Sequence, residues 1–219
     1  MNAIGNIYLS WRKGVGASRI PIGLFWRNSN NEIRFKYDLE EVKRAQKDGF
    51  NYFPDFPDFN KKEYKDNVLE IIGKRLINSE RSDIQKFYDF WEIKSEYKNE
   101  KYYLLAHTQG MLPTDNFEFL AEYNPTQDLS FISEICGLSH INIVSNFISV
   151  GEELQWKFNK ENKFDKNAVE IYKGETYLGN VKLIHCNVFH KKGGENLKIR
   201  VKSFEQNGHI SRVFIKISF

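Results

Sequence analysis

Two segments near the end of the chain alternate strictly between apolar and polar residues, and a strong turn signal lies between them. Leu197–Lys202 and Arg212–Ile217 each place every second side chain on one face of an extended strand. Asn207-Gly208 favours the tight turn of a β-hairpin, because the central positions of that turn need positive φ. These segments predict an amphipathic antiparallel pair, and therefore a sheet that buries one face.

Three shorter extended segments precede this pair. Alternation and composition predict strands over Leu154–Phe158, Ala168–Tyr172 and Tyr177–Val181. Gly174 supplies a tight connection between the last two, since glycine takes positive φ at little steric cost. With the terminal pair they make at least five strands, which is typical of a small, partly open barrel of the OB or SH3-like kind.

The first half of the chain has a different organisation, in which a short sheet precedes helices. Three strands are predicted, over Asn6–Trp11, Ile20–Trp26 and Glu32–Tyr37, with a turn at Asn28–Asn31. Asp38 is a good N-cap for a helix over Leu39–Lys47, which Gly49 would end. Two further helices are predicted, from Tyr64 to Leu76 and from a cap at Ser79 or Ser82 to Trp91.

The chain is therefore predicted to be an α+β protein of two domains. A small N-terminal sheet with helices occupies residues 1–127, and an OB/SH3-like β-barrel occupies residues 128–219. The connection falls near Asn124–Ser130.

The net charge of +3 is distributed unevenly between these parts. Residues 1–130 carry 19 Lys and Arg against 20 Asp and Glu, or −1, whereas residues 131–219 carry 13 against 9, or +4. Basic side chains surround the run 162–169 and line the outer face of the terminal pair: Lys157, Lys160, Lys163, Lys166 and Lys182, then Lys198, Arg200, Lys202, Arg212 and Lys216. This distribution permits nucleic-acid binding, although a solvated face explains it equally well.

No motif for catalysis or cofactor binding stands out. Gly14–Arg19 has the glycines of a phosphate loop, but a strand rather than a helix follows, so we predict a hairpin loop with a phosphate contact as the alternative. Cys136 and Cys186 form no metal pair, and we expect both to be reduced and buried. His185 and His190 lie outside the i, i+4 spacing of paired ligands. We predict no enzyme, no metal and no cofactor.

The chain carries no signal for a membrane. No apolar stretch approaches the length of a membrane span, and Met1–Arg12 lacks the basic start and apolar middle of a signal peptide. We expect a cytoplasmic protein without a membrane partner.

The run Asn162–Val169 lies between two predicted strands and is too polar for a core strand. Asp165 and Asn167 can hydrogen-bond nearby backbone groups, as in Asx turns, while Phe164 can point into the core or out toward a ligand. The run is therefore either a rigid turn with a buried aromatic or part of a binding rim.

The same run resembles the signature of the HIRAN domain, a small β-rich module found alone in bacteria or fused to helicases and nucleases. Asn162–Val169 fills every position of the family pattern Asn-x-aromatic-Asp-x-Asn-Ala-aliphatic, and Gly179 supplies the glycine-containing strand that should follow. Cys136–His140 matches in part the upstream Gly-Leu-Arg-aromatic element. The resemblance covers about residues 131–219 and implies a β-barrel of this family.

Relatives of this kind grip the free 3′ end of single-stranded DNA, so the resemblance implies roles for individual residues. Phe164 would stack on the terminal base, Asp165 would contact the terminal 3′ hydroxyl, and Lys163 and Lys182 would meet phosphates. The implied site comprises Asn162, Lys163, Phe164, Asp165, Asn167, Ser139, His140, Asn180 and Lys182.

Three of these positions depart from the family pattern. Ser139 and His140 replace an Arg and an aromatic, and Asn180 stands where some relatives have a phosphate-contacting His.

The first half resembles the small N-terminal subdomain of HipA-type kinase toxins and the leader of bacterial HIRAN proteins. Trp11, Pro21–Leu24 and Thr114–Phe119 fit the leader's pattern, whereas nothing matches a kinase catalytic loop. The prediction is a non-catalytic protein that recognises single-stranded DNA or free 3′ ends. The alternative is a protein-interaction subunit of a toxin-antitoxin or phage-defence system, whose toxin or effector partner is encoded nearby.

Overall fold

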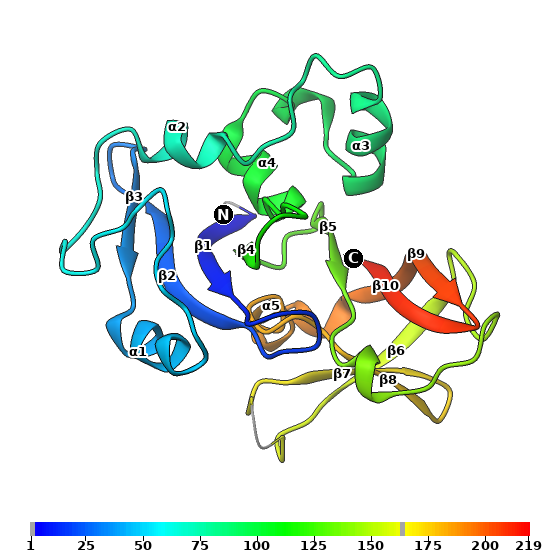
Figure 1. Cartoon of the computed structure of the whole chain (residues 1–219). Helices are drawn as coiled ribbons and strands as arrows, with labels where there is room; N and C mark the ends of the chain where they lie inside the picture. Colours follow the sequence, from blue (N-terminus) through cyan, green and yellow to red (C-terminus); the bar gives the residue numbers. More distant parts are fainter. Residues whose placement is uncertain (1–2, 163–164) are drawn as a thin grey trace. The chain divides into compact units, whose positions relative to one another are not determined.

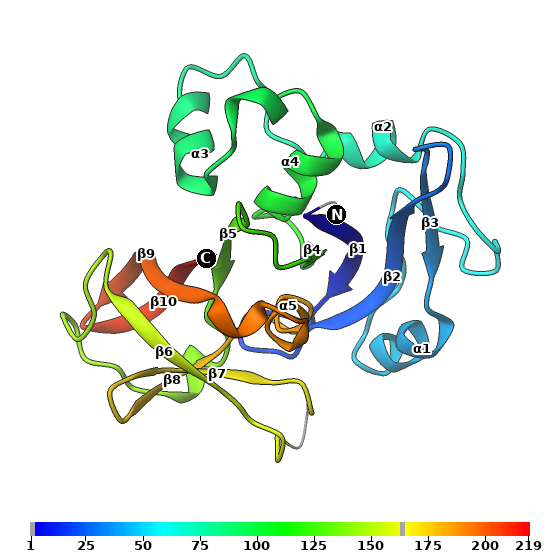
Figure 2. The same ribbon diagram turned by 180° about the vertical axis from the view of Figure 1, so that it is seen from behind.

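A computed structural model describes residues 3–162 and 165–219 of the chain. Its class is α+β, as predicted: a small four-stranded sheet with helices, and a curled six-stranded antiparallel sheet of the OB-like, half-barrel kind (Figures 1 and 2). The chain divides into two compact units, Ile4–Glu122 and residues 123–219 with Ala3. We call them the N-terminal unit and the C-terminal unit. The helices in the described ranges all fall short of what a membrane crossing would require in length and apolar character.

The small sheet has the strand order β3-β2-β1-β4. Its strands are β1 (Ile4–Trp11), β2 (Ile20–Arg27), β3 (Ile33–Tyr37) and β4 (Phe117–Tyr123). The first three strands and the Asn28–Asn31 turn were predicted and are confirmed. The strand β4 was not predicted, because nearly all its residues are buried and it therefore lacks the alternation that marks a half-exposed strand.

Helix α1 (Leu39–Lys47) confirms the predicted cap. The side chain of Asp38 accepts hydrogen bonds from the amides of Glu40 and Glu41, and Gly49 follows the helix with a φ of 100°. A carboxylate at this position satisfies amides that have no partner within the helix.

The later helices differ from the prediction. Helix α2 (Val68–Gly73) is short, because Tyr64 pairs with Phe35 as an extended residue instead of opening a helix. Helix α3 (Ile84–Trp91) begins after Asp83, so the predicted serine caps are wrong. Helix α4 (Lys101–Thr108) was missed, since burial of nearly all its residues leaves no amphipathic stripe.

The large sheet of the C-terminal unit has the strand order β5-β10-β9-β6-β7-β8. Its strands are β5 (Ser130–Glu134), β6 (Glu153–Phe158), β7 (Val169–Lys173), β8 (Thr176–Asn180), β9 (Lys198–Asn207) and β10 (His209–Ser218), with the single-turn helix α5 (Asn187–His190) between β8 and β9. The five predicted strands are confirmed. Gly174 and Gly208 occupy the hairpin turns with φ of 59° and 72°.

The two ends of this strand order meet through one pair of residues. The Cys136 amide donates to the Asn180 carbonyl at 2.7 Å, and the Asn180 amide donates back to the Cys136 carbonyl at 2.9 Å. Cys136 follows β5, and Asn180 ends β8. A curled sheet therefore becomes a partly closed barrel at this point.

Gly179 makes this closure possible. Its φ of 124° lies where residues with a side chain rarely go, and a Cβ atom there would collide with the carbonyl oxygen of Cys136. The glycine identified from the sequence thus has a definite role in the packing.

We expect Gly179→Ala to lower the free energy of unfolding by at least about 2 kcal/mol, since it combines backbone strain with a backbone collision. Gly174→Ala is the matched control: its φ is also positive, but no atom lies within 4 Å of its added Cβ. That change should cost only about 1 kcal/mol. Urea denaturation measures both, and equal losses would contradict the proposed closure.

His107 is a buried titratable group on α4. Burial and, to a smaller extent, the charge of Lys94 lower its pKa to about 4, and the ring stacks on Tyr103 at 4.1 Å. As the pH falls below about 6.5, the unfolded chain therefore takes up a proton that the folded chain accepts only near pH 4.

The folded state should lose roughly 2 kcal/mol through His107 between pH 7 and pH 5. His107→Phe retains an aromatic ring that can stack and removes this titration. Denaturation at pH 7 and pH 5 should therefore show a smaller loss in the free energy of unfolding for the variant. An equal loss would show that His107 is not its source.

Candidate nucleic-acid interface

The described residues of the run 162–168 form a turn between β6 and β7 that is held by hydrogen bonds. The Asp165 amide donates to Asn162 Oδ1 at 3.1 Å, and the Asn167 amide donates to Asp165 Oδ1 at 2.8 Å. The Ala168 amide closes the turn on the Asp165 carbonyl at 3.1 Å. The predicted Asx geometry of Asp165 is confirmed.

This turn occupies only one carboxylate oxygen of Asp165. The other, Oδ2, makes no hydrogen bond to any residue within the described ranges, and the side chain is partly exposed. Lys163 and Phe164, the predicted phosphate and stacking residues, lie outside the described residues. The turn can therefore present a charged acceptor to a ligand while its other oxygen holds the backbone.

Ser139 and His140 belong to a short 3-10 turn, Leu138–His140. Leu138 is buried and anchors the turn, whereas Ser139 and His140 are exposed. The turn follows Cys136, whose backbone pairs with Asn180. Closure of the barrel therefore brings the Ser139–His140 segment to the end of β8, although the two segments are far apart in the sequence.

Cys186 is a buried thiol within electrostatic reach of both Asp165 and Cys136. Burial raises the pKa of its thiol to about 12, and the charges of Asp165 and Cys136 add to the rise. The thiol donates to the Val181 carbonyl at 3.4 Å. Both cysteines are free, as expected, but Cys136 is partly exposed, so the prediction that both are buried is wrong for that residue.

Asn180 contributes an unusual buried group. Its Nδ2 donates to the Tyr177 hydroxyl at 2.6 Å, while its Oδ1 is buried without a hydrogen-bond partner in the described structure. If the amide is turned over, Tyr177 donates to Oδ1 and the NH₂ group loses its partner instead. Buried polar groups rarely stay unpaired, so this amide is suited to a polar group of a ligand or a water.

Lys182 requires a correction. Its side chain is fully buried, and Nζ lies 3.4 Å from Glu134 Oε2. Glu134 also binds Arg212, at 2.8 Å. The ammonium group therefore belongs to an internal ion pair, and a phosphate on the surface cannot reach it. Lys182 follows the end of β8 at Asn180, and the resemblance that implied a phosphate contact does not determine where its side chain points.

The basic strip on β9 and β10 is largely paired within the unit. Arg200 binds Glu153 at 2.9 Å, and Arg212 binds Glu134 and Glu205. Solvation and cross-strand pairing explain this strip better than a nucleic-acid track does. Lys157, Lys160 and Lys166, which surround the Asp165 turn, are exposed.

The Gly14–Arg19 loop connects β1 and β2, as the hairpin prediction required. The guanidinium of Arg19 makes a two-pronged contact with Glu118, at 2.8 and 2.9 Å, and Glu118 is buried. Arg19 thus supports the core of the N-terminal unit, and the alternative phosphate contact is not supported.

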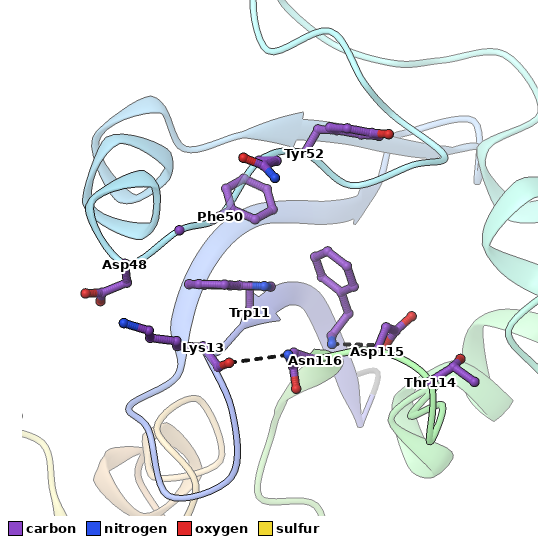
Figure 3. A pocket seen from close by; sticks show the side chains of 11 residues that line it. Trp11, Lys13, Asp48, Phe50, Tyr52, Thr114, Asp115 and Asn116 are labelled. Carbon is purple, nitrogen blue, oxygen red and sulfur yellow. Dashed lines mark hydrogen bonds between the residues drawn. The ribbon is translucent and has the colours of Figure 1, made fainter.

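An open pocket of about 470 Å³ lies in the N-terminal unit (Figure 3). Two of the three elements that fit the leader pattern line it: Trp11 at the end of β1, and Thr114–Phe117, which leads into β4. Asp115 is held by Arg75 at 2.8 and 2.9 Å. The exposed Tyr52 lies on the pocket wall. No pattern in the sequence indicates that these distant segments share a pocket.

Comparisons with known proteins give limited information. No protein-family model matches the chain, and no curated protein matches it. Two solved structures are similar. The HIRAN domain of human HLTF has 15% identity over 40% of this chain and 74% of that chain, with a TM-score of 0.32. A protein from Lactobacillus plantarum has 14% identity over 42% of this chain and 99% of that chain, with a TM-score of 0.29. At these TM-scores neither likeness bears on function.

Lys182→Met tests whether Lys182 belongs to an internal ion pair and not to a phosphate-binding surface. Removing the ammonium leaves Glu134 with one cation fewer in a buried setting, so we expect the free energy of unfolding to fall by about 3 kcal/mol. Nucleic-acid affinity at a temperature where the variant is folded should not change. Lys192→Met, at an exposed lysine, is the control and should be neutral in stability. A Lys182→Met protein that is as stable as the parent but binds nucleic acid more weakly would restore the original assignment.

Proposed function

We propose that the C-terminal unit binds single-stranded nucleic acid, DNA in the first instance, at a free 3′ end. The proposal rests on two polar groups: the carboxylate of Asp165, which keeps one oxygen outside its turn, and the amide of Asn180 at the barrel closure. The +4 charge of residues 131–219 is compatible with a polyanionic ligand.

In this proposal Asp165 reads the terminal hydroxyl. An ionised carboxylate accepts hydrogen bonds and cannot donate them, so its Oδ2 suits a hydroxyl and repels a phosphate. Two unit charges 4 Å apart repel by about 1 kcal/mol in bulk water and about 4 kcal/mol near a protein surface. A 3′-phosphate would therefore be rejected by electrostatics alone.

The neighbouring residues complete the proposed site. Asn180 Oδ1 can accept a hydrogen bond, which suits a sugar hydroxyl of the terminal nucleotide, and the exposed Ser139 and His140 flank this residue. Asn162 and Asn167 hold the turn through their contacts with Asp165. From the family resemblance, Phe164 stacks on the terminal base and Lys163 contacts a phosphate. These are binding roles, and we propose no catalytic step.

A second candidate function concerns the N-terminal unit. Its pocket brings together Trp11 and Thr114–Phe117, which belong to two of the three elements of the leader resemblance, with the exposed Tyr52 on its wall. This favours a contact with a partner protein, such as the toxin or effector of a toxin-antitoxin or phage-defence system. The two functions are compatible, since they occupy different units. Co-purification with the products of neighbouring genes tests the second, and a chain that always purifies alone contradicts it.

Fluorescence anisotropy tests the first function with single strands that end in 3′-OH or 3′-phosphate. We expect the 3′-OH strand to bind about tenfold more tightly, which corresponds to about 1.4 kcal/mol. Asp165→Asn should abolish this preference, because asparagine can form the same Asx turn but carries no charge. Glu161→Gln removes the same charge from an exposed neighbour and should leave the preference intact. Equal binding of both strands by the unmodified protein would refute end recognition.

A further inference from the structure

Four side chains form a continuous row across the outer face of β8, β7 and β6. Asn180 bonds the Tyr177 hydroxyl, the Tyr177 and Tyr172 rings lie 5.6 Å apart, and Lys157 Nζ lies 4.6 Å above the Tyr172 ring. We call these residues, Asn180, Tyr177, Tyr172 and Lys157, the tyrosine row. It starts at the proposed end-binding site and leads away from it.

The row belongs to the solvent side of the sheet. On β7 the side chains of Val169 and Ile171 are buried in the core, whereas Glu170 and Tyr172 between and beside them are partly exposed. Tyr172 pairs with Tyr177 in the register of β7 and β8. A cross-strand pair of aromatic rings of this kind stabilises a sheet, and both tyrosines are partly exposed, so the pair can also meet a ligand.

Hydrogen bonds fix the orientation of both rings. The Tyr172 hydroxyl donates to Glu170 Oε2 at 2.7 Å, and Glu170 Oε1 accepts from Asn159 at 2.6 Å. The hydrogen bond to Glu170 raises the pKa of Tyr172 to about 12, so the phenol stays neutral near pH 7. Rings that are already ordered lose little conformational entropy when a planar group stacks on them.

We propose that the tyrosine row is a stacking track for the nucleotides on the 5′ side of a bound 3′ end. This inference rests on the proposed end-binding function and extends it along the strand. Every base has a π face, so stacking on tyrosine tolerates any sequence, and proteins that bind single strands combine such rings with cations. Lys157, at the far end of the row, is exposed and placed to meet a backbone phosphate.

Charge fixes which part of the strand lies over the sheet. The carboxylate of Glu170 lies beside the Tyr172 ring and repels phosphates. Lys157 is the direct cross-strand partner of Glu170, so its ammonium offsets this carboxylate at the β6 edge of the row. We place the backbone along Lys157 and the bases over β7 and β8. Adjacent strands are about 4.8 Å apart, so the row spans roughly 10 Å from β8 to β6, which leaves room for a short run of nucleotides.

The dependence of affinity on strand length tests the track. The full chain is titrated with a fluorescent dinucleotide and an octanucleotide of mixed sequence, both ending in 3′-OH. We expect the octanucleotide to bind at least about tenfold more tightly, given the usual strength of base–aromatic stacking. Tyr172→Leu should lose most of this gain, and Tyr172→Phe, which keeps the ring, should retain most of it.

Tyr97→Leu, at an exposed tyrosine of the N-terminal unit, is the matched control and should change neither affinity. The stacking track is contradicted if Tyr172→Leu retains the full gain in affinity from the dinucleotide to the octanucleotide. It is also contradicted if the unmodified chain binds both lengths equally.

The same titrations with 3′-phosphate strands separate this proposal from the end-binding function. A preference for 3′-OH without a gain from length contradicts the track alone. A gain that depends on Tyr172 without a preference for 3′-OH supports the track and contradicts end recognition.

Discussion

The backbone pair between Cys136 and Asn180 is the interaction on which the C-terminal unit depends. It joins the two ends of a six-stranded order and can form only because Gly179 has no side chain. The same pair brings the Ser139–His140 turn to the end of β8, and the Asp165 turn leads into β7, which pairs with β8. The candidate site is thus a consequence of how the sheet closes.

The charged residues of this unit divide into those that hold the fold and those that face outward. Glu134 binds both Lys182 and Arg212, and Arg200 is paired with Glu153. Their charges are therefore largely satisfied within the protein. Asp165 differs, because its side chain uses only one carboxylate oxygen to bind the backbone of the turn, and the other oxygen can face a ligand. Specific recognition is better assigned to such a group than to the total positive charge, which mainly aids association.

Local signals were sufficient for much of the fold. Asp38, Gly174 and Asn207-Gly208 each predicted a cap or turn whose geometry depends only on nearby residues. Segments buried on all sides, such as β4 and α4, carry no periodicity and were missed. For the site, Asp165 could be predicted from its turn. The burial of Lys182 and the unpaired oxygen of Asn180 could not, because both depend on tertiary contacts.

The central claim is that one surface, assembled by the closure of the barrel, receives the end of a single strand. The most direct measurement is the change in amide NMR chemical shifts of the full chain on addition of a short 3′-OH oligonucleotide. Shifts should concentrate at Gly137–His140, Asp165–Ala168 and Tyr177–Asn180, with smaller effects reaching Tyr172. Shifts confined to the N-terminal unit, or none at saturating oligonucleotide, would contradict the account.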